Sequence, residues 1–148
     1  MELIKGRASG LIRTLAMTLA ILGFVSTVSA ADYVVIANKG VTTDSLSKSE
    51  LQATFLGEKT KWDDGKHITI IILESGDINK SFLQDIVEKT PSQYESYWKK
   101  LIFTGKATAP KSFNEVSKVI EFVAGQPGAI GYMASGEAGS TVKTITIK

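Results

Sequence analysis

The chain contains no cysteine, and residues 31–148 contain no arginine. Without cysteine there is no disulfide bond and no lipid anchor on a cysteine, so a hydrophobic core must stabilise the fold. His67 is the only histidine, whereas zinc sites normally take several His or Cys ligands. With no thiol and no evident acid–base pair, the sequence predicts no enzyme, no metal site and no cofactor.

Residues 1–30 have the three-part pattern of a signal peptide. They begin with basic residues, continue with the uncharged stretch Leu15–Val25, and end with the small residues Val28, Ser29 and Ala30. The apolar stretch is shorter than the ~20 residues that span a bilayer, which argues against a membrane anchor. We therefore expect cleavage after Ala30 and a periplasmic or secreted protein.

Loss of this segment would leave a formally neutral chain. The sequence has 17 Lys+Arg and 15 Asp+Glu residues, and residues 1–30 hold three of the basic residues and one acidic residue. Fourteen of each sign therefore remain in residues 31–148. Nucleic-acid binding relies on many cationic contacts to phosphates, so we expect no nucleic-acid partner. We also expect no stable membrane insertion after cleavage.

Four segments have the composition of β-strands. Ile68–Leu73 is rich in β-branched residues and apolar on both faces, which predicts a central strand covered by helices. In contrast, the segment Val142–Ile147 alternates between apolar and polar residues, as an edge or half-exposed strand does. The remaining two segments are Tyr33–Ala37 and Ala129–Tyr132.

Capping residues and glycines mark the predicted helices. Capping-box pairs stand at three helix starts: Ser47 with Glu50, Thr90 with Gln93, and Ser112 with Glu115. Glycines that favour a left-handed helix end follow the apolar periodic segments at Gly57, Gly105 and Gly125. Strands and helices thus alternate without a linker, which predicts one α/β domain over residues 31–148, with helices packed on a mixed sheet.

Two phrases resemble the second lobe of the phosphate-binding component of bacterial ABC transporters, a type II periplasmic binding protein. The first comprises Leu51–Gly57 and the Trp-Asp turn that starts at Trp62. The second, Gln126–Met133, reads Gln-Pro-Gly-Ala-Ile-Gly-Tyr-Met. Family members have two lobes, and this chain resembles one. The resemblance implies a single-lobe periplasmic-binding-protein-like domain, with a mixed, mostly parallel sheet flanked by helices.

The resemblance also implies a ligand loop between Leu73 and Phe82. The family has an arginine followed by a Gly-Ser-Gly-Thr phrase there, whereas this chain has Leu73 or Glu74 at the arginine position. The loop would lie at the carboxyl end of a strand and at a helix start, where anions bind. The candidate ligand-binding residues of this loop are Ser75, Gly76, Asp77 and Asn79. A plain turn capped by Asp77 is the alternative.

A second candidate loop follows the first predicted strand. Asn38 and Thr42 would contribute to the ligand site if this loop lies at the same edge of the sheet, although an ordinary turn at Gly40 explains the same residues. Elsewhere, the helically spaced residues Tyr94, Tyr97 and Trp98 fit either a buried core or a sugar-stacking surface.

The expected function is weak or partner-dependent binding of inorganic phosphate or another oxyanion, in a role accessory to phosphate uptake or sensing. Without an arginine and an opposing lobe, we expect the monomer to bind phosphate no better than millimolar. A second copy or another envelope protein would complete the site. The alternative is a periplasmic protein-interaction scaffold with no small ligand.

Overall fold

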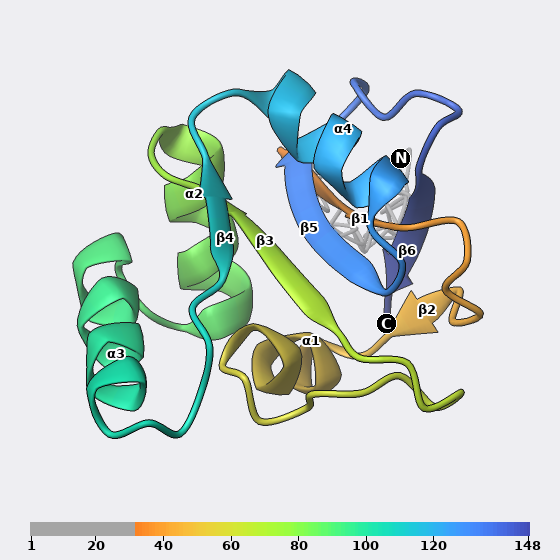
Figure 1. Ribbon diagram of the computed structural model, residues 1–148. Coiled ribbons are helices and arrows are strands. Elements are labelled where there is room, and N and C mark those ends of the chain that lie inside the picture. The colour runs from red at the N-terminus through yellow and green to blue at the C-terminus, as the bar shows by residue number, and fades with distance from the viewer. Residues whose placement is uncertain (1–31) are drawn as a thin grey trace, which may run out of the picture.

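The computed structural model describes residues 32–148, and the predicted signal peptide lies outside this part (Figure 1). The described chain forms one six-stranded sheet with helices around it. No helix in residues 32–148 is long and apolar enough to cross a membrane. In chain order the elements are β1 (Tyr33–Ala37), β2 (Ser45–Leu46), α1 (Lys48–Phe55), β3 (Thr69–Leu73), α2 (Asp77–Phe82), the π-helical turn η1 (Leu83–Val87), α3 (Pro91–Phe103), β4 (Lys111–Phe113), α4 (Val116–Gly125), β5 (Ala129–Ala134) and β6 (Lys143–Ile147).

The strand order in the sheet is β2-β6-β1-β5-β3-β4. β2 pairs with β6 in parallel, and β3 pairs in parallel with both β5 and β4. β1 runs antiparallel to its neighbours β5 and β6. The predicted mixed, mostly parallel sheet is therefore confirmed, and β1 is the strand that reverses direction.

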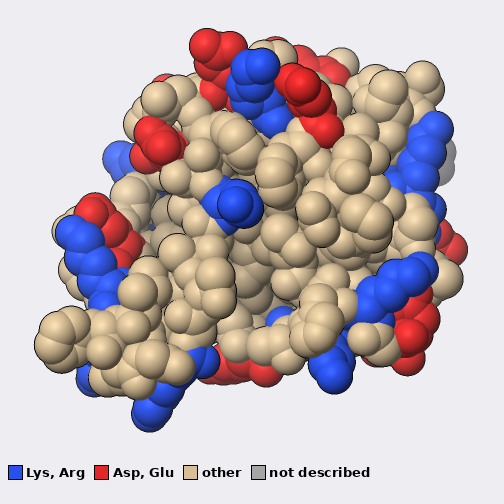
Figure 2. All heavy atoms as spheres, in the orientation of Figure 1, with Lys and Arg blue, Asp and Glu red and all other residues tan. Residues whose placement is uncertain are grey.

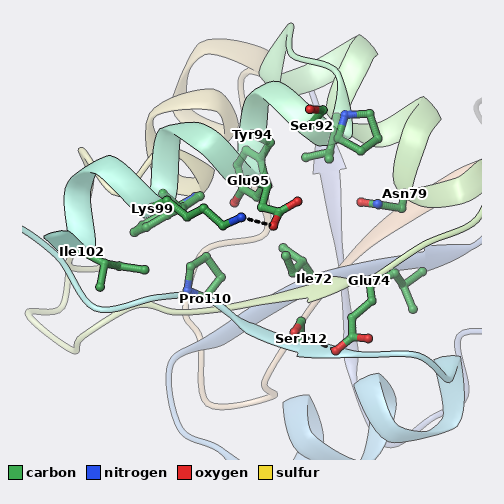
Figure 3. Close-up of a pocket in the computed structure, with 14 residues that line it drawn as sticks. Ile72, Glu74, Asn79, Ser92, Tyr94, Glu95, Lys99, Ile102, Pro110 and Ser112 are labelled. Carbon is green, nitrogen blue, oxygen red and sulfur yellow. Dashed lines mark hydrogen bonds and ion pairs between the residues drawn. The ribbon is translucent and has the colours of Figure 1, made fainter.

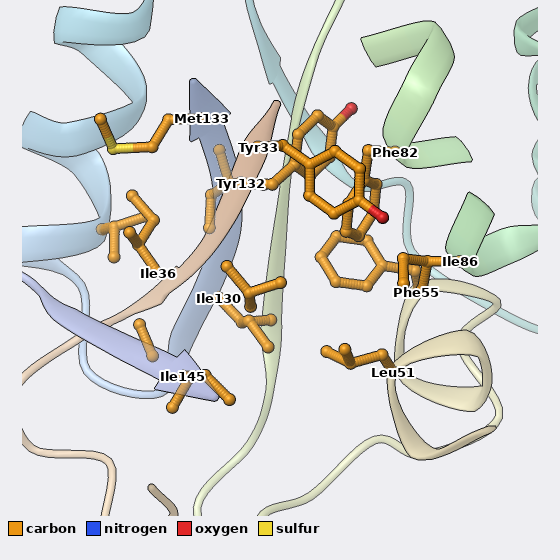
Figure 4. Packing of buried hydrophobic residues seen from close by; sticks show 14 of the residues in the cluster. Tyr33, Ile36, Leu51, Phe55, Phe82, Ile86, Ile130, Tyr132, Met133 and Ile145 are labelled. Carbon is orange, nitrogen blue, oxygen red and sulfur yellow. The ribbon is translucent and has the colours of Figure 1, made fainter. Parts of the chain in front are cut away.

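Helices cover both faces of the sheet (Figure 1). Val119 of α4 lies against Gly131 of β5 on one face. On the other face, the ring of Phe82 from α2 stacks on Tyr132 of β5, with centroids 3.9 Å apart. Phe55 of α1 and Tyr33 of β1 meet the same Phe82 ring edge-on at 4.7 and 5.3 Å (Figure 4). This aromatic cluster ties two helices to the two central strands.

The most deeply buried strand is β5 and not β3. Every residue from Ala129 to Met133 is buried, whereas in β3 only Ile71 and Leu73 are. As predicted, the segment Ile68–Leu73 forms an interior strand, although β3 lies one place from the edge and has only the three-residue strand β4 on its outer side. β6 is half-exposed as predicted, and the short β2 forms the edge beside it.

Two of the three predicted capping boxes are present, with Ser47 and Glu50 closing the start of α1 and Thr90 and Gln93 closing that of α3. The third prediction is wrong. Ser112 lies in β4, where it pairs with Ile72 of β3, and α4 begins three residues later than a Ser112 cap requires, without any side-chain cap. Ser112, which the local sequence predicts to be a helix cap, is instead part of a strand pair.

Glycine ends two helices as predicted, since Gly57 and Gly105 adopt positive φ values of 73° and 69°. The prediction for Gly125 is wrong, because that residue is still part of α4. The left-handed residue is instead Gly128, with φ of 77°, where a Cβ atom would collide with the His67 carbonyl. The Gly128 carbonyl also accepts a hydrogen bond from the buried Trp62 indole at 2.9 Å, so the two family-like phrases meet here.

Candidate functional site

The predicted ligand loop joins the carboxyl end of β3 to the start of α2. Ser75, Gly76 and Asp77 are all exposed there. Gly76 occupies the N-cap position with φ of 98°, and none of the side chains in residues 32–148 caps the helix. Asp77 is the first helical residue, so the prediction that it serves as the N-cap is wrong.

The backbone amides from Ser75 to Asn79 have no acceptor within residues 32–148. The first helical hydrogen bond runs from the Lys80 N–H to the Gly76 carbonyl at 3.1 Å. The preceding N–H groups, from Ser75 to Asn79, donate to none of the described residues. Unpaired amides at a helix start carry partial positive charge and can donate hydrogen bonds to an anion.

Two carboxylates lie close to these amides. Asp77 is exposed in the first turn, and Glu74 is exposed in the loop, where its carboxylate accepts a hydrogen bond from the Ser112 hydroxyl at 3.1 Å. Negative charge near a helix start stabilises the helix itself but repels an incoming anion. The loop therefore offers hydrogen-bond donors to an oxyanion in an unfavourable electrostatic setting.

Asn79 differs from the other candidates because it is buried, with 4% of its surface exposed. Its side-chain oxygen accepts a hydrogen bond from the Tyr132 hydroxyl at 2.7 Å. That hydroxyl in turn accepts the Leu73 N–H at 3.3 Å. Burial raises the pKa of Tyr132, so its hydroxyl remains a protonated donor. The sequence placed Asn79 in the loop but gave no sign that Tyr132 holds it.

Asn38 and Thr42 lie at the opposite edge of the sheet. Because β1 is antiparallel to β5, its last residue Ala37 pairs with Ile130 near the start of β5. β3 is parallel to β5, so the loop that follows it lies at the other end. The prediction that both loops share one edge is therefore wrong.

The side chain of Asn38 is also fully occupied in closing the end of α4. Its amide donates to the Val123 and Ala124 carbonyls at 2.9 and 3.0 Å, and its oxygen accepts the Gly40 N–H at 2.9 Å. Thr42, in the same loop, is exposed. The turn that the sequence offered as an alternative accounts for Asn38.

A pocket of about 480 Å³ lies between α3 and the strands β3 and β4 (Figure 3). Its apolar wall includes Ile72, Leu83 and Ile102, and Asn79 contributes a polar group. Glu95 and Lys99 form an ion pair of 2.6 Å on α3 at this pocket. Sequence patterns gave no indication of the pocket, because it depends on how far α3 stands from the sheet.

The aromatic residues of α3 belong to the packing of the fold. The hydroxyls of Tyr94 and Tyr97 donate to the carbonyls of Phe55 and Leu56 at 2.8 and 2.7 Å. The indole of Trp98 packs directly under Gly57, where a Cβ atom would lie 2.6 Å from the ring. These contacts fix α3 to the end of α1, which supports the core interpretation over sugar stacking.

The surface carries no concentrated charge in the view of Figure 2, which shows acidic and basic side chains interspersed around a mostly uncharged centre. Among residues 32–148, no group of three or more His, Cys, Asp or Glu side chains is placed to hold a metal ion.

No family model and no curated protein matches the sequence. Solved structures do match the fold. PstS from Borrelia burgdorferi aligns with a TM-score of 0.61 and 17% identity, over 79% of this chain and 47% of that protein. A putative phosphate ABC transporter substrate-binding protein from Clostridium perfringens with bound phosphate aligns with a TM-score of 0.60 and 17% identity, over 78% of this chain and 44% of that protein.

This chain has the fold of one part of a phosphate-receptor protein. An ABC-type phosphate transport receptor from Vibrio cholerae gives the same result, with a TM-score of 0.55 and 16% identity over 78% of this chain and 46% of that one. The chain thus spans less than half the length of these neighbours. At such identities the similarity shows the fold alone.

Proposed function

We propose that the chain is a solute-binding domain that holds an oxyanion, such as inorganic phosphate, at the start of α2. The observation that carries the proposal is the run of N–H groups from Ser75 to Asn79, which have no acceptor within the described chain. Donors of this kind bind anions at helix starts. The fold that presents them is shared with an ABC-type phosphate transport receptor and with a substrate-binding protein that holds phosphate.

Binding by the isolated monomer is weak on this proposal. No arginine is present in residues 31–148 to make a bidentate contact, and Glu74 and Asp77 oppose the anion. The loop is exposed, and charge interactions in water are several-fold weaker than in a closed site. We expect a dissociation constant no better than millimolar, and calorimetry that gives a micromolar value for the monomer would contradict this.

Two substitutions at Asp77 test the role of the amides separately from that of charge. Asp77→Ala removes the carboxylate and keeps the N–H, so phosphate should bind several-fold more tightly than to the unaltered protein. Asp77→Pro removes both, and proline is tolerated at this first helical position. Its affinity should fall below that of Asp77→Ala. Equal affinities of the two variants would show that the Asp77 N–H does not bind the anion.

A partner would complete the site by covering the open loop. We propose a second copy of the chain or another envelope protein, because the chain spans less than half of its structural neighbours. Light scattering should show an assembly that phosphate strengthens, or a pulldown from envelope extract should recover a partner. A strict monomer that phosphate does not change, and that recovers no partner, would contradict the proposal. In either form, the role is accessory to phosphate uptake or sensing and not catalytic.

The second candidate function is a protein-interaction scaffold without a small ligand. It is favoured by the end of α3, where Phe103 is 94% exposed and Ile102 45%. On this view substitution of Ser75 and Gly76 leaves every interaction unchanged, whereas Phe103→Ala lowers recovery of the partner. On the oxyanion proposal, the Ser75 and Gly76 substitutions weaken the response to phosphate, because a side chain at Gly76 disfavours the φ of 98° that presents the amides. Phe103→Ala leaves that response intact.

Export is also part of the proposal, because both functions place the chain in the bacterial envelope or outside the cell. The support is the three-part pattern of residues 1–30. Mass spectrometry of the periplasmic and secreted fractions should find a product that begins at Ala31. Recovery of the uncleaved chain in the cytoplasm would contradict export.

A further inference from the structure

We propose that the pocket between α3 and the β3–β4 strands is a second ligand site, which takes an uncharged amide-bearing molecule with an apolar or aromatic body. The pocket adjoins the oxyanion loop and shares Glu74 and Asn79 with it, and its polar group of fixed orientation is the side-chain amide of Asn79 (Figure 3). This proposal does not depend on phosphate binding.

The orientation of the Asn79 amide is fixed by its neighbours. The Tyr132 hydroxyl accepts the N–H of Leu73 at 3.3 Å, which leaves its own proton to donate. The acceptor, 2.7 Å away, is therefore the Asn79 oxygen, and the amide nitrogen must point the other way. Because Tyr132 and Leu73 are both buried, this arrangement is held by the core of the domain.

The Asn79 amide nitrogen has two N–H groups and no acceptor among residues 32–148. The residue as a whole is 4% exposed and forms part of the pocket wall. The nitrogen is not fully enclosed by the protein, so it is open to the pocket and can donate to an acceptor oxygen there. A carbonyl oxygen of a ligand is such an acceptor.

The remaining wall suits an apolar body. Its volume of about 480 Å³ falls within the ~300–1,000 Å³ typical of ligand pockets, which are mostly apolar with a few placed polar groups. Tyr94 and Trp98 contribute aromatic surface, and the other apolar members are Ile72, Leu73, Leu83, Pro91, Ile102 and Pro110. Because Ser92 and Ser112 also line the pocket beside Asn79, the wall suits a molecule with an apolar body and carbonyl acceptors.

The charges at the pocket disfavour an anion. Lys99 is paired with Glu95 at 2.6 Å and is thereby neutralised. Within the described residues, the Glu74 carboxylate accepts a hydrogen bond from the neutral Ser112 hydroxyl at 3.1 Å and forms no ion pair, so its negative charge remains. A carboxylate or phosphate ligand would be repelled, whereas a neutral amide would not. The pocket and the oxyanion loop thus differ in the ligands that they select.

The test is a titration of the isotope-labelled protein followed by NMR, with N-acetyl-phenylalaninamide as the neutral probe. We expect the side-chain NH₂ signal of Asn79 to shift with saturation, and N-acetyl-phenylalanine, which carries a carboxylate, to bind at least tenfold more weakly. No shift up to the solubility limit, or equal binding of the anionic probe, would overturn the proposal. Phosphate, titrated separately, should shift the backbone amides from Ser75 to Asn79 more than this side-chain signal.

Substitutions test which residues of the pocket contact the probe. Asn79→Leu should weaken probe binding about tenfold, which corresponds to ~1.4 kcal/mol. Because that change also affects Tyr132, a second variant, Ile102→Ala, removes part of the half-exposed pocket rim and should weaken binding several-fold. Phe103→Ala is its matched control, since Phe103 is exposed beside Ile102 but does not line the pocket. Equal effects of the Ile102 and Phe103 variants would overturn the assignment.

Discussion

The two family-like phrases and the loop between β3 and α2 are built in opposite ways. In the phrases, Trp62 donates to the Gly128 carbonyl, and Tyr132 stacks on Phe82 inside the core. In the loop, Ser75, Gly76 and Asp77 are exposed, and no side chain caps the helix. The contrast shows that the resemblance to phosphate receptors lies in buried contacts that specify the fold. The residues that would recognise a ligand lie outside it.

The largest loss of stability that we expect is that of Gly128→Ala, which disturbs the buried contact between the two phrases. An alanine there combines a left-handed backbone with a collision against the His67 carbonyl, and we expect a loss of about 4 kcal/mol in unfolding free energy. Gly136→Ala is the control, since Gly136 has φ of 87° with open space around it, and should lose about 1 kcal/mol. Urea denaturation measures both. Similar losses at the two sites would mean that the packing at Gly128 is not as described.

The next effect is that of Tyr132→Phe. Removing the hydroxyl leaves the Leu73 N–H and the Asn79 oxygen without partners inside the core, and we expect a loss of about 2–3 kcal/mol. Tyr97→Phe removes one hydrogen bond, to the Leu56 carbonyl at a half-buried position, and should lose about 1 kcal/mol. Thermal or urea unfolding compares the pair. A larger loss of stability for Tyr97→Phe than for Tyr132→Phe would argue against the buried hydrogen-bond network.

A smaller difference separates capped from uncapped helix starts. Thr90→Ala removes the capping box of α3 and should lower the free energy of unfolding by about 1 kcal/mol. Ser75→Ala should change it by less than ~0.5 kcal/mol, because the Ser75 side chain caps nothing. A loss at Ser75 equal to that at Thr90 would show that the serine does close the start of α2.

The smallest effect distinguishes the two capping boxes by pH. Hydrogen bonds from the Ser47 backbone and hydroxyl lower the pKa of Glu50 below its usual 4.5. A lowered carboxyl pKa stabilises the fold above the usual value, and this stabilisation disappears as the pH falls through the lowered pKa. Gln93 in the other box does not titrate.

We therefore expect Ser47→Ala to be less destabilising at about pH 3 than at about pH 7, and Thr90→Ala to be equally destabilising at both. Chemical denaturation of both variants at the two pH values measures this. If lowering the pH reduced the destabilisation by both substitutions equally, the Glu50 charge would have no role in the capping box of α1.

Much of the fold could be predicted from local sequence. The boxes at Ser47 and Thr90 and the glycine ends at Gly57 and Gly105 were all found, because each is decided by residues a few positions apart. The Ser112 cap was wrongly predicted, since pairing with the distant strand β3 decides that residue. Local patterns carry no information about such pairings.

The candidate site was less predictable than the fold. The position of Ser75 and Gly76 after a strand and before a helix followed from the sequence, but the shared edge with Asn38 did not, because it depends on the antiparallel direction of β1. Likewise, the burial of Asn79 beneath Tyr132 joins residues from distant parts of the chain. These features arise from topology, which a single sequence specifies only indirectly.

The most direct test of the account is an NMR titration of the protein with inorganic phosphate, following each backbone amide. We predict progressive shifts confined to the amides of Ser75 to Asn79 and the adjoining turn, with a dissociation constant in the millimolar range or weaker. Saturation at micromolar phosphate, or shifts centred elsewhere while these amides remain unchanged, would contradict the proposed oxyanion site.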